Sequence, residues 1–228
     1  MTYAVVDMES GIPGLDKLYK FQKKQIILVY GPPGPEKADF AQQFIFEGLK
    51  AGEPAIYITM DHSPQEIREL MLNRGWDISQ FEESGQFRFI DCYSWTIHEK
   101  DPSHSVTTIP SPSALSELAI AISMLMQKMK EARVVFDSMS TILLYNEETA
   151  VFKFFQVLAS KTKHFGAMMI VLLEAGMHPE SVKVTIEHLT DGTLLMKTFP
   201  DQVLKIERIA NTDWVSYKIT DEGVVVLA

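Results

Sequence analysis

Cysteine and long hydrophobic runs are nearly absent from this 228-residue chain. Its single cysteine, Cys92, cannot form an intrachain disulfide, which excludes a disulfide-stapled secreted scaffold. The longest purely apolar run, 167–173, has seven residues, whereas a membrane-spanning helix needs about 20. Residues 1–10 show neither the basic nor the apolar part of a secretory signal. We therefore expect a cytoplasmic protein without membrane contact.

Positive charge is also scarce, with 21 Lys and Arg residues against 30 Asp and Glu residues and a formal net charge of -9. A protein that neutralises phosphate backbones needs a basic face, so this balance disfavours nucleic acid as a partner. A hydrophobic content of 46% is that of a globular chain with a large buried core. No linker-like break in composition is visible, and we expect one domain over residues 1–228.

Short apolar runs alternate with segments of helical spacing as far as residue 173. The runs predict strands at 26–30, 55–59, 87–90, 134–137 and 167–173. Helical spacing predicts helices over 36–50 and 64–74, a helix that Ser111 caps and Pro112 begins, and a helix through 152–159. Continuously apolar strands are typical of a sheet covered on both faces. Strand–helix alternation therefore predicts a mostly parallel sheet with helices on both faces.

The last part of the chain has a different pattern. Four strands are predicted after residue 190, joined by short turns without helices, at 192–198, 203–209, 214–219 and 224–227. They predict an antiparallel β meander at the edge of the sheet. The fold class expected from the whole sequence is thus α/β, with this meander at its carboxyl end.

The one long irregular stretch, 95–110, is polar and contains two prolines. Loops of this length are usually functional or mobile. It is interpreted either as a surface insertion, as a lid that covers the carboxyl edge of the sheet, or as a partner-binding loop anchored by Trp95 and Ile97. Its histidines, His98 and His104, lack partners at zinc-site spacing and are interpreted as solvated.

A phosphate-loop pattern follows the first long strand. Residues 31–38 read GPPGPEKA, and compared with G-x-x-x-x-G-K-[ST] they keep the first glycine, Gly31, and the lysine, Lys37. Glu36 stands at the second glycine and Ala38 at the hydroxyl residue that ligates Mg²⁺. Pro35 removes a backbone N–H from a loop that binds phosphate through such groups.

Each of these changes opposes nucleotide binding. A carboxylate about 5 Å from one phosphate charge costs about 3 kcal/mol at an effective dielectric of about 20. Gly31, Gly34 and Lys37 are therefore predicted to form a vestigial nucleotide-binding loop. ATP with Mg²⁺ is expected only at weak affinity, and no other cofactor is indicated.

Several segments together carry a family resemblance: SGIPGLD at 10–16, GPPG at 31–34, DHSP at 61–64, VFDS at 135–138 and LTDG at 189–192. In order and spacing they resemble the KaiC-like branch of the RecA superfamily of ATPases over about residues 10–226. The likeness is greatest to archaeal single-domain members, which include proteins regarded as inactivated ATPases and linked to signal transduction. The resemblance implies a RecA-like fold.

The resemblance also implies roles for single positions. The family has two adjacent glutamates, one of them the catalytic base, where this sequence has Asp61 and His62. Asp137 matches the acid that holds Mg²⁺ through water, although an acid at a strand end also caps turns. The family's lysine and arginine that reach a neighbouring subunit's nucleotide have Lys205 and Arg208 as candidates, in an ambiguous register in which Glu207 can take the arginine's place.

Three functions remain open from the sequence. The first is a catalytically degenerate regulatory or scaffolding module, with a protein partner or self-association. The second is a weak ATP-binding protein or slow ATPase that uses Lys37, Asp61 and Asp137. The third is a recombination accessory protein, which the acidic composition disfavours.

Overall fold

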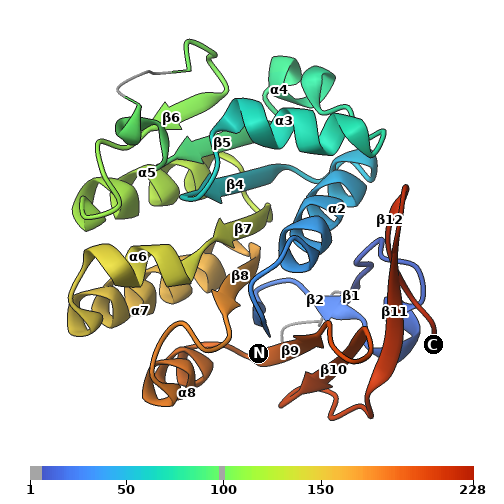
Figure 1. Ribbon diagram of the computed structural model, residues 1–228. Coiled ribbons are helices and arrows are strands. Elements are labelled where there is room, and N and C mark those ends of the chain that lie inside the picture. The colour runs from blue at the N-terminus through green and yellow to red at the C-terminus, as the bar shows by residue number, and fades with distance from the viewer. Residues whose placement is uncertain (1–6, 98–100) are drawn as a thin grey trace, which may run out of the picture.

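The centre of the molecule is a twisted ten-stranded sheet in the order β12-β11-β10-β9-β3-β8-β7-β4-β5-β6 (Figure 1). The computed structural model describes residues 7–97 and 101–228. The strands from β9 to β6 are parallel to their neighbours, and β9 to β12 form antiparallel pairs. The sheet strands are β3 (Ile26–Gly31), β4 (Ala55–Thr59), β5 (Phe87–Asp91), β6 (Val106–Thr108), β7 (Arg133–Asp137), β8 (Met168–Glu174), β9 (Gly192–Lys197), β10 (Val203–Glu207), β11 (Val215–Thr220) and β12 (Gly223–Val226). A separate antiparallel pair joins β1 (Asp7–Met8) to β2 (Phe21–Gln22).

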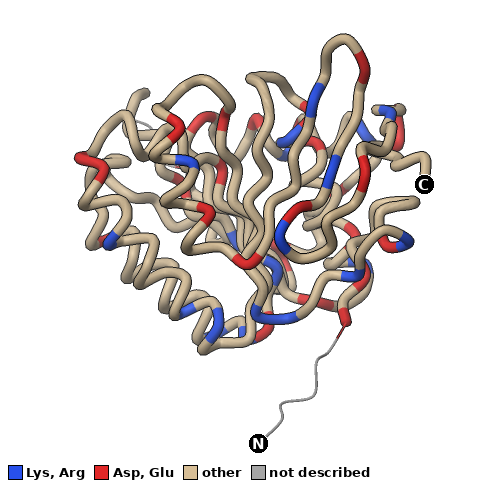
Figure 2. Tube along the Cα trace, turned by 90° about the horizontal axis from the view of Figure 1, so that it is seen from below, with Lys and Arg blue, Asp and Glu red and all other residues tan. Residues whose placement is uncertain are grey.

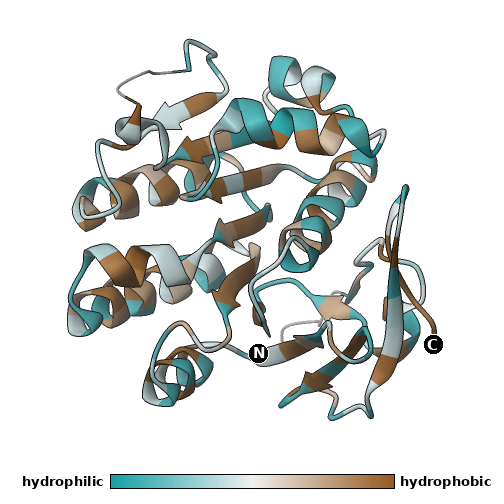
Figure 3. Cartoon of the chain, in the orientation of Figure 1, coloured by the Kyte–Doolittle hydropathy of each residue, from teal (hydrophilic) through white to brown (hydrophobic). Residues whose placement is uncertain are grey.

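Helices cover both faces of the sheet. Neighbouring residues of a strand point to opposite sides, so a strand made only of apolar residues presents an apolar surface on each face. In β3, Ile27 and Val29 pack in one core, whereas Ile26 and Leu28 pack in the other. Figure 3 shows the strands and the inner faces of the helices as the most hydrophobic parts. The helices are α1 (Leu15–Leu18), α2 (Glu36–Lys50), α3 (Pro64–Asn73), α4 (Ser79–Ser84), the 3-10 helix η1 (Ser94–Thr96), α5 (Leu115–Lys128), α6 (Met139–Tyr145), α7 (Glu148–Phe165) and α8 (Glu180–Leu189).

The predicted fold class is confirmed, including the parallel sheet and the antiparallel meander. One helix start was wrong: α5 begins at Leu115, and Ser111 is not its cap. The Ser111 hydroxyl instead accepts a hydrogen bond from the Ser113 N–H, and the Ser111 carbonyl accepts one from the Ala114 N–H. Ser111 therefore closes a turn before the helix. The short helices α4 and α6, and α8, were not predicted.

The SGIPGLD segment packs against the last strand of the sheet. Gly14 has φ 82°, and a side chain there would place its Cβ 1.9 Å from the Val226 carbonyl oxygen, so only glycine fits. The Val226 N–H donates to the Pro13 carbonyl, and the Ser10 N–H donates to Asp16. The motif is thus explained by packing between the two ends of the fold.

The described residues contain no helix that is long and apolar enough to cross a membrane. In Figure 2 acidic and basic positions are interspersed along the chain.

Candidate functional site

A cleft of about 350 Å³ lies at the carboxyl ends of β3, β4, β7 and β8. In parallel α/β sheets this edge is the usual place for ligands. The cleft brings together five of the candidate binding and catalytic residues, Gly34, Lys37, Asp61, His62 and Asp137, and the substituted loop positions Pro35 and Ala38. Gly31, the sixth, is buried at the end of β3 and does not line it.

Lys37 is held by partners within the chain. Its side chain is 3% exposed, and its Nζ donates to the Pro32 carbonyl at 2.5 Å. The same Nζ lies 3.5 Å from Oε1 of Glu174, the last residue of β8. Sequence reasoning missed Glu174 because the apolar run ends at residue 173, although an acid at the carboxyl end of a buried strand was the signal used for Asp137.

The carboxylate of Glu36 lies beside the backbone of Gly34 in the loop. A Cβ placed on Gly34, which has φ 152°, would be 2.3 Å from Glu36 Oε2. The carboxylate therefore occupies space beside the Gly34 backbone, where a phosphate-binding loop leaves room for its ligand. From the sequence we expect the Glu36 carboxylate to repel phosphate, and in the structure this carboxylate lies beside Gly34.

Asp137 is buried at the end of β7, and its Oδ2 accepts a hydrogen bond from the Tyr57 hydroxyl at 2.6 Å. Burial, with a smaller contribution from the nearby carboxylates of Asp61 and Glu174, raises the pKa of Asp137 to about 7, against the opposing effects of the Tyr57 hydrogen bond and of Lys37. Between about pH 4 and pH 7 this carboxyl is ionised in the unfolded chain but still protonated in the folded one, so it lowers the free energy of unfolding as the pH rises through that range.

Asp61 and His62 precede α3, whose start is fixed by a capping box between Ser63 and Glu66. Both side chains are exposed. The Asp61 carboxylate accepts hydrogen bonds from the hydroxyls of Ser138 and Thr141. His62 lies beside Glu66, with Nδ1 3.9 Å from Oε2. Asp61 thus reaches the cleft edge but is already bonded to the segment that follows Asp137.

The two candidates for contact with a neighbouring subunit have partners in their own chain. Lys205 on β10 pairs with Glu207 at 2.8 Å and lies 6.0 Å from the Trp214 ring. Arg208 donates to the hydroxyl and the carbonyl of Thr190, at 3.0 and 2.8 Å. Lys205 and Glu207 lie on the same face of β10, away from the core. The structure therefore does not decide whether Glu207 or Arg208 takes the position of the family's arginine.

The stretch 95–110 is more regular than expected. It includes the end of η1 and the edge strand β6, and its described residues do not line the cleft. Trp95 packs edge-on against Tyr145, whereas Ile97 is 51% exposed. His98 lies outside the described residues. The described part of the stretch thus extends the sheet edge through β6, and the interpretation as a lid stays a prediction.

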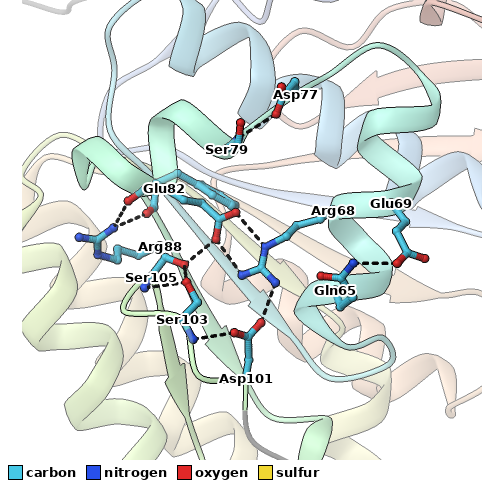
Figure 4. Close-up of polar contacts among 11 residues, drawn as sticks. Gln65, Arg68, Glu69, Asp77, Ser79, Glu82, Arg88, Asp101, Ser103 and Ser105 are labelled. Carbon is cyan, nitrogen blue, oxygen red and sulfur yellow. Dashed lines mark hydrogen bonds and ion pairs between the residues drawn. The ribbon is translucent and has the colours of Figure 1, made fainter.

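A strap, residues 101–105, is fastened to α3 and α4 by a polar cluster (Figure 4). Arg68 donates through Nε and Nη2 to Glu82 at 2.8 and 2.9 Å, and through Nη1 to Asp101 at 2.6 Å. The Ser105 hydroxyl also donates to Glu82. Asp101 in turn accepts from the Ser103 N–H at 2.8 Å. Arg68 therefore joins three segments that are separate in the sequence.

Replacing Arg68 with methionine is expected to release the strap. Methionine keeps the apolar stem but removes all three charge-assisted hydrogen bonds. We expect amides 101–109 to exchange with solvent about tenfold faster in hydrogen-exchange mass spectrometry. Lys163→Met, which breaks the exposed pair with Asp191, is the control and leaves these amides unchanged. Unchanged exchange in Arg68→Met would mean that backbone pairing with β5 alone holds the strap.

Comparison with known proteins identifies relatives of this chain. A family model described as "ATPase: KaiC" matches residues 8–228. A UPF0273 protein from Pyrococcus horikoshii is 32% identical over 144 residues, covering 60% of this chain and 56% of that protein. A UPF0273 protein from Aeropyrum pernix is 25% identical over 249 residues, covering 96% and 92% of the two chains. The circadian clock protein KaiC3 of Synechocystis is 30% identical over 178 residues, covering 76% of this chain and 34% of that protein.

The chain spans 56% of the length of the Pyrococcus horikoshii relative. Among solved structures, the crystal structure of a KaiC-like protein from Pyrococcus horikoshii superposes with a TM-score of 0.79 at 21% identity. That match covers 99% of this chain and 100% of the other. At this level of identity the likeness shows the fold, and it confirms the fold class predicted from the sequence.

Proposed function

Because this chain belongs to the KaiC family of ATPases, we propose that it is a single-domain cytoplasmic member that has lost ATP turnover and acts as a regulatory or scaffolding module. The observation that carries the proposal is the charge of the cleft. One lysine and four acidic side chains line it, of which Asp39 is paired with Arg74 and Asp137 has a raised pKa: Lys37, Asp39, Asp61, Asp137 and Glu174. A triphosphate entering this cleft meets repulsion of several kcal/mol.

The contacts of the functional groups support the same conclusion. Lys37 is engaged by Pro32 and Glu174, and Asp61 by Ser138 and Thr141. Neither group is free to act on a nucleotide without breaking a bond within the chain. A regulatory role also agrees with the Synechocystis relative, whose name is that of a circadian clock protein. The partner of such a module is another protein or a second copy of the chain.

Direct measurement of nucleotide binding and turnover tests the proposal. We expect no ATPase activity above background and a dissociation constant for Mg-ATP weaker than about 0.1 mM by calorimetry, since repulsion of about 3 kcal/mol corresponds to about 100-fold in affinity. Lys37→Ala is the control for contaminating ATPases. Turnover that this substitution abolishes would show a working site and overturn the proposal.

A weak ATP-binding protein is the second candidate. It is favoured by one observation: Gly34, Lys37 and Asp137, three of the positions that hold nucleotide and Mg²⁺ in the family that the chain resembles, still line one cleft. In that case Lys37 exchanges Glu174 for phosphate. Binding tighter than about 0.1 mM without turnover would support this candidate over the first.

A further inference from the structure

The outer surface of α5 and α7 combines exposed apolar side chains with lysines. The two helices lie side by side over one face of the sheet and pack in the same core (Figure 1). On α5, Ile120 and Met124 are 60% and 66% exposed, and on α7 Val157 is 52% exposed. Residues four apart on a helix are neighbours, and at this spacing each apolar stripe continues into exposed lysines. We call this set the α5–α7 face: Ile120, Met124, Lys128, Lys153, Val157 and Lys161.

The carboxyl ends of the two helices lie close together. Helix α5 leads into β7 and α7 into β8, which are parallel neighbours, so both helices end at the amino edge of the sheet. The Glu131 N–H donates to the Phe165 carbonyl at 3.0 Å and joins the turn after α5 to the end of α7. The positive charges of Lys128 and Lys161 therefore act on one region of the surface.

The lysines of this face have no acidic partner in the chain. Residues 118–130 and 149–173 contain no aspartate or glutamate, and in the described part of the protein no ion pair or hydrogen bond involves Lys128, Lys153 or Lys161. The helix dipole favours cations in the last turn, which explains Lys128 at the end of α5. It does not explain Lys153 in the first half of α7. These charges are thus available to an outside partner.

Charge and hydrophobicity together indicate the class of that partner. An acidic surface complements the lysines, which give up no internal ion pair when it binds. A nucleic acid would meet the lysines through its phosphates and leave the exposed apolar side chains without partners. A membrane-binding face carries Trp, Phe or Leu, and this face has none of them. A second copy of the face would bring lysine against lysine. A protein surface that is both acidic and apolar remains.

We propose that the α5–α7 face binds an acidic amphipathic helix of a partner protein. The apolar side chains of that helix pack against those of the face, and its carboxylates pair with the lysines. The proposal rests on the proposed function, because a regulatory or scaffolding module acts through a partner. It assigns no role to the cleft.

Fluorescence anisotropy with a labelled synthetic peptide tests the proposal on the full chain. The peptide has about 20 residues, with leucines along one helical face and glutamates on the other. We expect saturable binding with a Kd between about 10 µM and 1 mM. Binding is expected to be about tenfold weaker in Lys128→Glu with Lys161→Glu, and about fivefold weaker in Ile120→Ser with Met124→Ser.

The matched control reverses two exposed lysines elsewhere, in Lys50→Glu with Lys218→Glu, and is expected to change the affinity by less than about twofold. Melting temperatures of all variants establish that each is folded. Equal weakening by the two charge reversals would reveal general attraction between peptide and protein and overturn the proposal. No binding at about 1 mM peptide would overturn it as well, and so would equal binding of a peptide with alanine in place of leucine.

Parallel titrations distinguish the other occupants. Tighter binding of phosphatidylglycerol vesicles or of duplex DNA, lost in Lys128→Glu with Lys161→Glu, would assign the face to a membrane or a nucleic acid instead. Dimerisation in sedimentation velocity that the same substitutions abolish would assign it to a second copy. The ATPase assay keeps the two hypotheses apart: failure of peptide binding overturns only this docking face, whereas turnover that Lys37→Ala abolishes overturns the proposed function.

Discussion

The double substitution Glu36→Gly with Ala38→Thr is expected to raise the affinity for Mg-ATP about 100-fold without restoring turnover. Glycine removes the carboxylate that lies against Gly34, which relieves about 3 kcal/mol of repulsion from one phosphate charge. Threonine returns the hydroxyl that ligates Mg²⁺ beside the phosphates. Calorimetry measures the affinity, and release of inorganic phosphate measures turnover.

A second variant separates charge from shape in this loop. Glu36→Gln with Ala38→Thr keeps the bulk of the side chain and removes its charge, so an intermediate gain is expected when both effects oppose ATP. Hydrolysis stays absent in both variants because Asp61 remains bonded to Ser138 and Thr141. Full turnover would contradict this expectation and identify Asp61 or His62 as the base.

Arg133→Met is expected to lower the free energy of unfolding by about 3–5 kcal/mol. The guanidinium is 3% exposed and donates to the carbonyls of Glu9, Ser10 and Phe44, besides Glu53. It also lies 4.5 Å from the centre of the Phe44 ring. Methionine fills most of the space but leaves these acceptors without a donor. Urea denaturation and a fall of about 10 °C in the melting temperature measure the effect.

Arg208→Met is the matched control for this substitution. Arg208 also donates to backbone and side-chain oxygens, both on Thr190, but it is exposed. Water replaces the lost bonds there, so the expected change is within about 0.5 kcal/mol. An equal fall in the free energy of unfolding in the two variants would mean that the contribution of Arg133 to stability does not depend on its burial.

Arg133 and Glu174 show what the sequence could and could not predict. Apolar runs placed β7 and β8 correctly because a buried strand needs continuous apolar side chains. The polar residues at their ends were left out: Arg133 precedes the run of β7, and Glu174 follows that of β8. Their roles depend on partners distant in the chain, Glu9 and Lys37 among them, and no local pattern encodes such pairs.

The candidate site was predictable in its members but not in its internal bonding. The phosphate-loop pattern supplied Lys37, the family resemblance supplied Asp61 and Asp137, and all three line one cleft. Local spacing contained no sign that Tyr57 would bond to Asp137 or that Glu36 would lie against Gly34. Helix α6, which follows Asp137, was missed because only seven residues form it.

The contact between Gly14 and Val226 has a consequence for synthesis. Because Pro13 accepts a hydrogen bond from the Val226 N–H, the segment that contains the buried Ile12 and Leu15 cannot complete its packing until β12 has been made. A ribosome delivers these two segments about 200 positions apart, and closing so long a loop is a slow step in assembly. The two apolar side chains thus leave the ribosome long before β12, so they stay exposed to solvent while most of the sheet is being translated.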